Sequence, residues 1–454
     1  MSARAGMERD RDTIFALASG RPPAGLAVVR ISGPRTRLVL ETTLGAVPPA
    51  RRAAYRAIRA PGGETIDRGV VLFFEGPASY TGEDSAELHL HGGRAVVAAT
   101  LAILGDLPGL RPATAGEFTR RAFDNGRLDL TAVEAVADLV AAETDAQRRQ
   151  ALRQLDGGLA EVAGDWRRRL LHARALIEAE LDFADEDDVP DSAAAAVWAD
   201  MAQLSADLGK VLAGGRVGER IRDGFEIAIL GPPNAGKSSL LNALAGRDVA
   251  IVTDVPGTTR DLLEVHLDLG GFAVTLVDTA GLRETTETVE AEGIRRAKAR
   301  AADADLVLWL ADAGQPPPAD LHGSETDAGS GPLWIIGTKR DLDSDSKRDS
   351  PAARLDHRIS AQTGAGLDSL VAALTAHVAG LVPAEPALVT RARHRLCLQA
   401  AKTAIDAAVA NGAAPLEVRA EGLRQAGEAL GELIGRIDVE DVLGAIFSEF
   451  CVGK

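Results

Sequence analysis

The sequence predicts a multidomain protein with α/β and α+β parts, and three observations support this prediction. Short strand-like runs separated by Gly and Pro turns occupy residues 13–125. From about 128 to 216 the chain is rich in Ala, Leu and Arg, with apolar residues at the three- and four-residue spacing of amphipathic helices. Residues 225–378 alternate strand-like and helical stretches, which is typical of a mostly parallel sheet flanked by helices.

The N-terminal part of this architecture is predicted to be an α+β domain at residues 1–127. Its strand-like runs are GLAVVRI, GVVLFF and AELHLH. A helical domain is predicted from two segments, 128–216 and 379–454, with an α/β domain inserted at 217–378. Such an insertion is tolerable because the ends of a domain often lie close together. The last helical segment has an apolar stripe formed by Val439, Val442, Leu443, Ile446, Phe447 and Phe450.

The composition is ordinary for a globular chain without membrane spans. The chain has 454 residues, of which 46% are hydrophobic and 26% are charged. No apolar run approaches the roughly 18 residues of a transmembrane helix, and the N-terminus lacks the apolar core of a secretory signal. Two cysteines cannot build a disulfide framework, which indicates a reducing compartment. We therefore expect a cytoplasmic protein.

The net charge of −16 argues against broad binding of nucleic-acid phosphates, which requires clustered Lys and Arg. Three short basic segments are exceptions: RRQALRQ at 148–154, WRRRLL at 166–171 and RARHRL at 391–396. The simplest interpretation of each is a solvated helix face. An RNA substrate would need a basic partner or a narrow basic strip.

The segment GPPNAGKSS at 231–239 fits the P-loop pattern. It follows the strand-like run EIAIL and precedes the helical run LLNALAG, which is the context that a P-loop requires. Its glycines allow backbone N–H groups to surround phosphates, Lys237 would place a charge at the β- and γ-phosphates, and Ser238 would offer a hydroxyl to Mg²⁺. A plain glycine-rich turn is the alternative, and the strand–loop–helix context argues against it.

Two further motifs that contact Mg²⁺ and the γ-phosphate follow in the order typical of GTPases. GTTR at 257–260 places Thr259 to reach both groups. DTAG at 278–281 ends a strand, so Asp278 can hold Mg²⁺ through water and the Gly281 N–H can contact the γ-phosphate.

Two later motifs, TKRD at 338–341 and SAQTG at 360–364, occupy the positions that recognise guanine. Asp341 would accept hydrogen bonds from N1–H and the 2-amino group of guanine, which adenine cannot donate. The five ordered motifs predict a Ras-like P-loop GTP-binding (G) domain.

Two positions depart from the usual GTPase pattern. Thr338 stands where Asn is usual, and a hydroxyl has fewer hydrogen-bonding groups than an amide, so lower GTP affinity or selectivity is expected. Leu282 stands where a Gln often orients the attacking water, so another residue must do this. Glu290 is a candidate; a solvated carboxylate at the start of a helix is the alternative.

The chain resembles the MnmE (TrmE) family of tRNA-modification GTPases across nearly its whole length. The matching segments are VVRISGP, SYTGEDSAELHLHGG, AGEFTRRAFDNGRLDLTAVEAVADL, NAGKSSLLNAL, TDVPGTTRD, DTAGLRE and the terminal FCVGK. Of these, AGEFTRRAF and FCVGK are the most specific, because a P-loop alone fits any GTPase. The resemblance implies an N-terminal folate-binding domain and a helical domain interrupted by the G domain.

The resemblance also implies partners and an activity. Members of the family dimerise through the N-terminal domain and act with the flavin-dependent MnmG subunit, so a homodimer within a heterotetramer is implied. The implied reaction adds an (carboxymethyl)aminomethyl group to C5 of the wobble uridine of certain tRNAs. A tetrahydrofolate derivative of the 5-formyl or 5,10-methylene type is the implied one-carbon donor, and the partner would provide much of the tRNA binding.

For the nucleotide site, the resemblance supports Glu290 as the residue that positions water. It also implies that K⁺ is bound by Asn234, Thr253, Val255 and Thr258, where a cation would supply the charge that an arginine finger gives elsewhere. The full set of candidate GTP-binding residues is Asn234, Ala235, Gly236, Lys237, Ser238, Ser239, Thr253, Asp254, Val255, Pro256, Gly257, Thr258, Thr259, Asp278, Thr279, Ala280, Gly281, Thr338, Lys339, Asp341, Ser360 and Ala361.

For folate, the resemblance implies Arg30, Glu87, Arg127 and Lys454. A carboxylate suits the amino-pyrimidine edge of the pterin, and cations suit its oxygen atoms and acidic tail. The family commonly has Lys where this chain has Arg127, an exchange that keeps the charge but changes the geometry. Without the resemblance, Arg30 and Glu87 would be interpreted as surface charges.

The terminal FCVGK has three interpretations. A prenylation signal is disfavoured because Gly453 stands where an aliphatic residue is needed, and the upstream residues are acidic rather than basic. Cys451 could pack at the edge of the apolar stripe as a small hydrophobic residue. The resemblance instead implies that Cys451 lies near the one-carbon chemistry, as a nucleophile or a redox-active thiol.

Two other functions compete with the tRNA-modifying enzyme. A GTPase switch or ribosome-assembly factor without modification chemistry shares every nucleotide motif, but it gives no reason for the N-terminal domain or the terminal cysteine. A prenylated signalling GTPase depends on the disfavoured interpretation of FCVGK.

Overall fold

The structure is a computed structural model that describes residues 12–182, 192–232, 234–251, 264–278, 304–311, 331–342, 355–383, 386–436, 443–444, 446–447, 450 and 453. The chain forms two compact units, each described here by itself. Unit 1 comprises Met1–Ala137, Gln154–Ala194 and Ala410–Lys454, and unit 2 comprises Asp138–Arg153 and Ala195–Val409. Helical segments contribute to both units, and the domain boundaries predicted from the sequence stay predictions.

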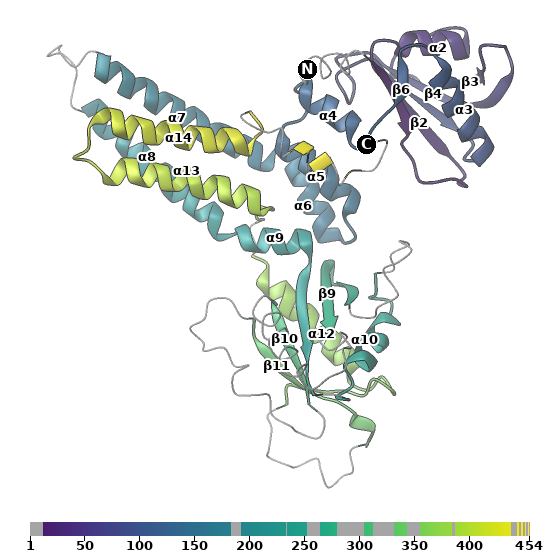
Figure 1. The fold of residues 1–454 in the computed structure, drawn as a ribbon. Helices are drawn as coiled ribbons and strands as arrows, with labels where there is room; N and C mark the ends of the chain where they lie inside the picture. Colours follow the sequence, from purple (N-terminus) through teal and green to yellow (C-terminus); the bar gives the residue numbers. More distant parts are fainter. Residues whose placement is uncertain are drawn as a thin grey trace, which may run out of the picture. The chain divides into compact units, whose positions relative to one another are not determined.

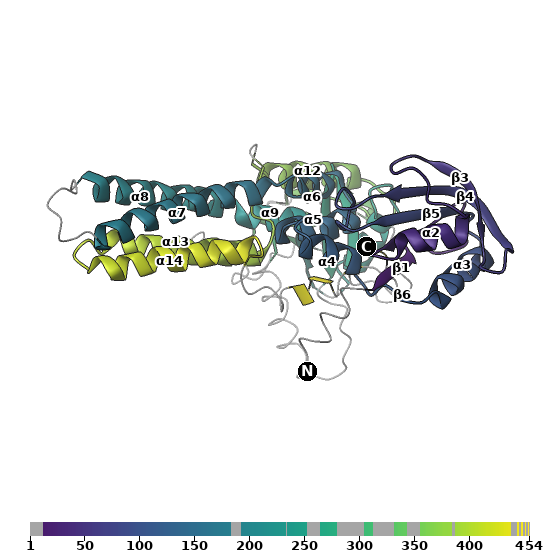
Figure 2. The ribbon, with the colours of Figure 1, turned by 90° about the horizontal axis from the view of Figure 1, so that it is seen from above.

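Unit 1 contains a six-stranded sheet in the order β3-β4-β5-β2-β1-β6. Only the β1–β6 pair is parallel, and the other neighbours are antiparallel. Two helices, α2 and α3, contribute Val39, Leu40 and Leu104 to the core on one face of this sheet (Figure 2). The elements are β1 (Thr13–Leu17), β2 (Ala27–Ser32), α2 (Thr36–Leu44), β3 (Ala54–Arg59), β4 (Thr65–Phe74), β5 (Ser85–Leu90), α3 (Arg94–Asp106) and β6 (Leu110–Pro112).

The alternation of side chains along β2 and β5 separates an apolar face from a charged one. Val29 and Ile31 of β2 are fully buried in the core beneath α2 and α3. Arg30 lies between them in the sequence, so it faces the opposite side of the sheet. Glu87 of β5 lies opposite Arg30 in the strand register, and its neighbours Ala86 and Leu88 are buried in the core. The strand pairing therefore brings Arg30 and Glu87 together.

The helices of unit 1 are α4 (Glu117–Asp124), α5 (Leu130–Ala141, which continues into unit 2), α7 (Gly158–Asp182) and α14 (Leu416–Leu433). Helices α7 and α14 pack along each other (Figure 1). The predicted apolar stripe is confirmed for Leu443, Ile446, Phe447 and Phe450, which form a buried cluster with Leu130 and Val133 of α5. Val439 and Val442 lie outside the described residues.

The described end of the chain packs against β1. A Cβ atom added at Gly453 would lie 2.2 Å from the carbonyl oxygen of Leu17, so only glycine fits there. Leu17 is paired with Val29, the residue before Arg30. Gly453 therefore lies beside β1, the strand that pairs with β2 and its Arg30.

Unit 2 contains a second six-stranded sheet, in the order β12-β11-β10-β7-β9-β8. All pairs are parallel except β8–β9, which confirms the predicted mostly parallel sheet. Helices α10 and α12 pack on it, with Leu240, Leu241, Leu370 and Leu374 in the core (Figure 1). The elements are β7 (Phe225–Leu230), α10 (Lys237–Ala245), β8 (Glu264–Leu269), β9 (Phe272–Asp278), β10 (Leu306–Ala311), β11 (Leu333–Gly337), the short 3₁₀ helix η2 (Arg340–Leu342), β12 (His357–Arg358) and α12 (Leu367–Leu381).

The other helices of unit 2 are α6 (Asp145–Leu155), α8 (Ser192–Ala213), α9 (Gly215–Asp223) and α13 (Ala392–Ala410). The last residues of α6 belong to unit 1. Helix α9 leads into β7, and Val389 follows α12. A Cβ atom added at Gly218 of α9 would lie 1.9 Å from the carbonyl oxygen of Val389. The chain that enters the α/β region and the chain that leaves it are therefore in direct contact. No helix in the described part of the chain is long and apolar enough to cross a membrane.

Candidate functional site

The P-loop connects β7 to α10 in unit 2. Gly231 has a φ of +149° and leaves no room for a Cβ atom, which would lie 2.5 Å from the carbonyl oxygen of Leu310. Asn234 and Gly236 also have positive φ angles, +62° and +93°. Helix α10 begins at Lys237, directly after this turn. A helix N-terminus that follows such a loop is a binding site for anions, because its first N–H groups have no partner within the helix.

Lys237 is held inside the loop. Its Nζ donates hydrogen bonds to the carbonyl oxygens of Gly231, at 2.8 Å, and Pro232, at 3.0 Å, and the residue is 8% exposed. Burial lowers the pKa of the Lys237 ammonium from its ordinary value, and the charge of Asp278 opposes this shift. A phosphate group that enters the loop would meet this ammonium and the first turn of α10.

Ser238 and Asp278 are brought together from separate motifs. Strand β9 ends at Asp278, and Ser238 Oγ donates a hydrogen bond to Asp278 Oδ2 at 3.3 Å. A hydroxyl and a carboxylate oxygen at this edge of the sheet are the hard ligands that Mg²⁺ prefers. The chemistry of this donor set therefore fits the predicted magnesium ion.

A cavity of about 270 Å³ lies beside the start of α10. The two predicted guanine motifs meet the P-loop helix there. The lining residues are Gly236, Ser239, Leu240, Thr338, Lys339, Asp341, Ile359, Ala361 and Gln362. This cavity has the position and the polar groups for a guanine base.

Asp341 is oriented by a neighbouring motif. Ser360 Oγ donates a hydrogen bond to Asp341 Oδ1 at 2.5 Å, and the N–H of Thr363 donates to Ser360 Oγ at 3.2 Å. Ser360 is fully buried, so its position is fixed by packing. The Thr338 hydroxyl donates to the carbonyl oxygen of Ala311 at 3.4 Å, so in this structure it is directed at the backbone.

A second group of predicted residues lies on the face of the unit 1 sheet opposite α2 and α3. Arg30 Nη2 and Nε lie 3.0 and 3.2 Å from Glu87 Oε1. The other carboxylate oxygen, Glu87 Oε2, lies 3.3 Å from His89 Nε2. The side chains of Arg30 and Glu87 are 24% and 20% exposed, so the ion pair is accessible from solvent.

Two aromatic rings flank Arg30. The guanidinium carbon of Arg30 lies 5.4 Å from the centre of the Tyr80 ring and 5.7 Å from that of Phe118. The Tyr80 hydroxyl lies 2.8 Å from Thr119 Oγ1, and burial raises the pKa of Tyr80. Arg127 lies nearby, since a Cβ atom on Gly82 would be 3.3 Å from its Cγ. The structure thus brings the segment 80–87 together with Arg30 and Arg127.

Thirteen candidate residues lie outside the described part of the chain. They are Thr253, Asp254, Val255, Pro256, Gly257, Thr258, Thr259, Thr279, Ala280, Gly281, Glu290, Cys451 and Lys454.

Several residues of these sites were not predicted from the sequence. Leu240, Ile359 and Gln362 line the cavity, and His89 and Tyr80 contact the Arg30–Glu87 pair. Gln362 belongs to the motif SAQTG, so the motif itself could have identified Gln362 as a residue of the guanine site. His89 follows Glu87 by two residues, which places both side chains on one face of a strand.

Two family models together match nearly the whole chain. The model of the GTP-binding protein TrmE N-terminus matches residues 13–127, and the model of the MnmE helical domain matches residues 130–451. A tRNA modification GTPase MnmE of Azorhizobium caulinodans is 54% identical over 449 residues, which is 99% of this chain and 100% of that protein. The chain belongs to the MnmE family. A second MnmE, from Brucella anthropi, is 53% identical over 98% of each chain.

Membership of the MnmE family confirms the predicted resemblance and fold class. Among solved structures, Era from Aquifex aeolicus matches 39% of this chain and 66% of its own, with 24% identity and a TM-score of 0.26. That likeness is too partial to bear on function.

Proposed function

We propose that this MnmE-family chain is a GTP-hydrolysing enzyme of tRNA modification. With a flavin-dependent partner subunit, it adds an (carboxymethyl)aminomethyl group to C5 of the wobble uridine of certain tRNAs. The main support is the relative from Azorhizobium caulinodans, which is named a tRNA modification GTPase and is 54% identical over 99% of this chain. The P-loop and the cavity beside α10 supply the matching chemistry.

GTP is bound by two separate sets of residues. The loop with Lys237 binds the phosphates, and Asp341, held by Ser360, accepts hydrogen bonds from the guanine base. Because ATP cannot make those hydrogen bonds, GTP binds in preference to ATP despite Thr338. Equal competition by ATP and GTP against labelled GTP would contradict this specificity.

Ser238 and Thr259 would hold Mg²⁺, and Asp278 would contact it through water. When bound, Mg²⁺ neutralises charge on the β- and γ-phosphates. Ser238 and Asp278 face each other across 3.3 Å, as this role requires. Removal of Mg²⁺ by a chelator should therefore abolish hydrolysis.

Hydrolysis also depends on K⁺ and on Glu290. Asn234, at the positive φ angle of the P-loop, would hold K⁺ with Thr253, Val255 and Thr258. A cation there supplies positive charge at the transferred phosphate. Glu290 positions the attacking water. Hydrolysis rates should be much higher in KCl than in NaCl, and identical rates in the two salts would contradict the potassium site.

The Arg30–Glu87 pair forms part of a folate site with Arg127 and Lys454. The exposed carboxylate of Glu87 offers acceptors to an amino-pyrimidine edge, and Tyr80 adds a planar aromatic face beside it. A bound tetrahydrofolate derivative supplies the one-carbon unit. Gly453 packs against β1, which supports placing Lys454 and Cys451 near this pair.

Cys451 acts in the modification as a nucleophile or a redox-active thiol. Cys451→Ser should abolish modification and leave GTP hydrolysis unchanged. Full modification by this variant would show instead that Cys451 is a packing residue.

The proposed assembly is a cytoplasmic homodimer that joins the MnmG-type flavin subunit in a heterotetramer. The chain has a net charge of −16, so most tRNA contacts belong to that partner.

The decisive experiment is mass spectrometry of tRNA nucleosides from a strain that lacks this chain. Unmodified wobble uridine, restored by the wild-type gene, supports the enzyme. Normal modification in the deletion strain would favour the alternative, a GTPase switch or assembly factor without modification chemistry.

A further inference from the structure

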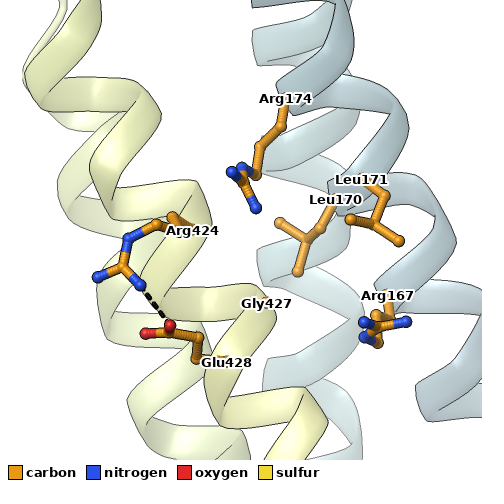
Figure 3. A pocket seen from close by; sticks show the side chains of 7 residues that line it. All are labelled: Arg167, Leu170, Leu171, Arg174, Arg424, Gly427 and Glu428. Atoms are coloured by element: carbon orange, nitrogen blue, oxygen red, sulfur yellow. Dashed lines mark hydrogen bonds and ion pairs between the residues drawn. The ribbon is translucent and has the colours of Figure 1, made fainter.

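Two cavities in the described part of the chain differ in how their polar groups are used. The cavity between α7 and α14 in unit 1 has a volume of about 280 Å³ (Figure 3). Its Arg424 is already paired with Glu421, at 2.7 Å, and with Glu428. The cavity beside α10 in unit 2 is lined by Gln362, whose side chain has no hydrogen bond to any residue that the structure describes. The proposed guanine site therefore contains an amide group that is available to a ligand.

A tight turn after β12 fixes the position of Gln362. The N–H of Ser360 donates to the carbonyl oxygen of Ala365 at 2.9 Å, and the N–H of Gly364 donates to the carbonyl oxygen of Ser360 at 3.0 Å. Ser360 is fully buried, and its hydroxyl also donates to Asp341. The turn therefore fixes the backbone of Gln362 relative to Asp341, and both residues line the cavity.

Guanine presents hydrogen-bond donors on one edge and acceptors on the next. Asp341 is the proposed acceptor for the donors, N1–H and the 2-amino group. O6 and N7 are acceptors and need donors from the protein. A carboxylate has no hydrogen to donate, so Asp341 cannot satisfy O6 and N7. Binding is weakened when an acceptor loses water without gaining a donor.

Thr338 is poorly placed to supply the missing donor. Its hydroxyl donates to the carbonyl oxygen of Ala311 at 3.4 Å, and its N–H donates to the same oxygen at 3.1 Å. The amide that GTPases usually have at this position is absent. Among the residues that line the cavity, Gln362 is the one whose side chain ends in an amide, which carries two N–H donors.

We propose that the side-chain amide of Gln362 donates a hydrogen bond to the edge of guanine that bears O6 and N7. Gln362 thereby replaces the amide that Thr338 lacks and is a binding residue of the nucleotide site. This role rests on the proposed binding of GTP and adds a residue that the motif pattern did not assign. The alternative is that Gln362 only packs against the base, which would not require an amide.

The test is the affinity of the full-length chain for GDP and ADP, which are not hydrolysed, measured by isothermal titration calorimetry with ADP in competition. Gln362→Met keeps an unbranched side chain of similar length and removes the amide. If Gln362 donates a hydrogen bond to guanine, affinity for GDP should fall about tenfold.

Gln362→Glu separates reading of the base from repulsion of the phosphates. The variant keeps the shape of the side chain but replaces the donor with a carboxylate, which repels O6 and N7. Adenine has an amino donor at C6 instead of O6, so ADP does not suffer this repulsion. Both nucleotides carry the same phosphates, so the ratio of the two affinities isolates the base. The preference for GDP over ADP should fall about tenfold or more.

Thr338→Asn provides a rescue. Asn at this position offers the missing amide, so the double variant Thr338→Asn/Gln362→Met should bind GDP within about twofold of the wild type. Gln399→Met is the matched control, at an exposed glutamine of α13 that donates to Thr403 at 3.4 Å. This control should bind GDP as the wild type does.

Unchanged GDP affinity in Gln362→Met would overturn the proposal and would show that other donors satisfy O6 and N7. Equal losses of GDP and ADP affinity in Gln362→Glu would also overturn it, because phosphate repulsion alone would explain them. If the wild-type chain binds GDP and ADP equally, the guanine specificity in the proposed function is wrong and the role of Gln362 with it.

Discussion

The nucleotide site and the Arg30–Glu87 site are assembled in different ways. In the nucleotide site, each group lies at or after the end of a strand of one mostly parallel sheet, so short contiguous motifs contain the chemistry. The Arg30–Glu87 pair joins residues 57 positions apart through the register of two antiparallel strands. The first kind of site is visible in a linear pattern, whereas the second depends on which strands are neighbours.

Lys237→Ala is the strongest test of this difference. The variant removes the only charge that the described loop directs at the phosphates, so kcat for GTP should fall about 100- to 1000-fold, as for other groups that stabilise transition-state charge. Folate binding should not change if the two sites are independent. Lys210→Ala, at an exposed lysine of α8, is the control. A parallel loss of folate affinity would show that the sites are coupled.

Acid should affect the contributions of Glu117 and Asp305, one in each unit, in opposite directions. Burial alone would raise the pKa of Glu117 in unit 1. Hydrogen bonds from Arg111 at 2.6 and 2.8 Å and from the N–H of Thr114, with the charges of Arg111 and Arg121, together outweigh burial and lower the pKa to about 2. Since the folded pKa lies below the unfolded one, Glu117 stabilises unit 1 above about pH 4.5, and this is lost as the pH falls toward 2. Burial raises the pKa of Asp305 in unit 2, so the contribution of Asp305 to the stability of that unit grows as the pH falls.

Urea unfolding at pH 5 and pH 3 would measure the effect of Glu117. A variant that keeps Trp166 as its only tryptophan reports on unit 1, because this side chain is buried in α7. The free energy of unfolding should fall by about 2 kcal/mol from the Glu117 contribution. Glu117→Gln should show a correspondingly smaller fall. Equal pH dependence in the two proteins would contradict this role of Glu117.

Glu87→Ala should weaken folate binding about tenfold, because a charge-assisted hydrogen bond is lost and Arg30 is left without its ion pair. The measurement is titration with a tetrahydrofolate derivative. Glu64→Ala, at an exposed glutamate of unit 1, is the control. GTP hydrolysis should be unaffected, and an unchanged folate affinity would exclude Glu87 from the site.

Ser360→Ala should have the smallest effect. It removes one hydrogen bond to Asp341 but leaves the carboxylate in place, so GTP affinity should fall about fivefold. ATP affinity should not change, because adenine makes no use of this carboxylate. Equal losses for GTP and ATP would show that Ser360 supports the loop rather than guanine recognition.

The sequence predicted most of the architecture and the contents of the nucleotide cavity. The motif order placed Gly236, Asp341 and Ala361 around one cavity, because each motif follows a strand of the mostly parallel sheet. It did not predict β12, which has only two residues and forms by pairing with β11. Nor did it predict the contact of His89 with Glu87, since alternation identifies a face but not which charges meet on it.

The family resemblance identified site residues that the chemistry and spacing of the residues alone did not identify. Arg30 and Glu87 carry no pattern that distinguishes them from surface charges, and only strand pairing shows that they form an ion pair. Roles assigned to Glu290, Cys451 and Lys454 stay predictions, because these residues lie outside the described part of the chain.

The contact between Gly218 and Val389 has a consequence for how the α/β region is joined to the rest of unit 2. Gly218, where the chain enters the α/β region, touches Val389, where the chain leaves it, so the chain between them is a closed loop with fixed ends. The entropy cost of closing a loop grows only slowly with the length of the loop. Insertions within this loop should therefore have little effect on the stability of the helices that surround the junction. A side chain at position 218 would instead push α9 away from Val389 and would loosen the contact between the entering and leaving chain segments.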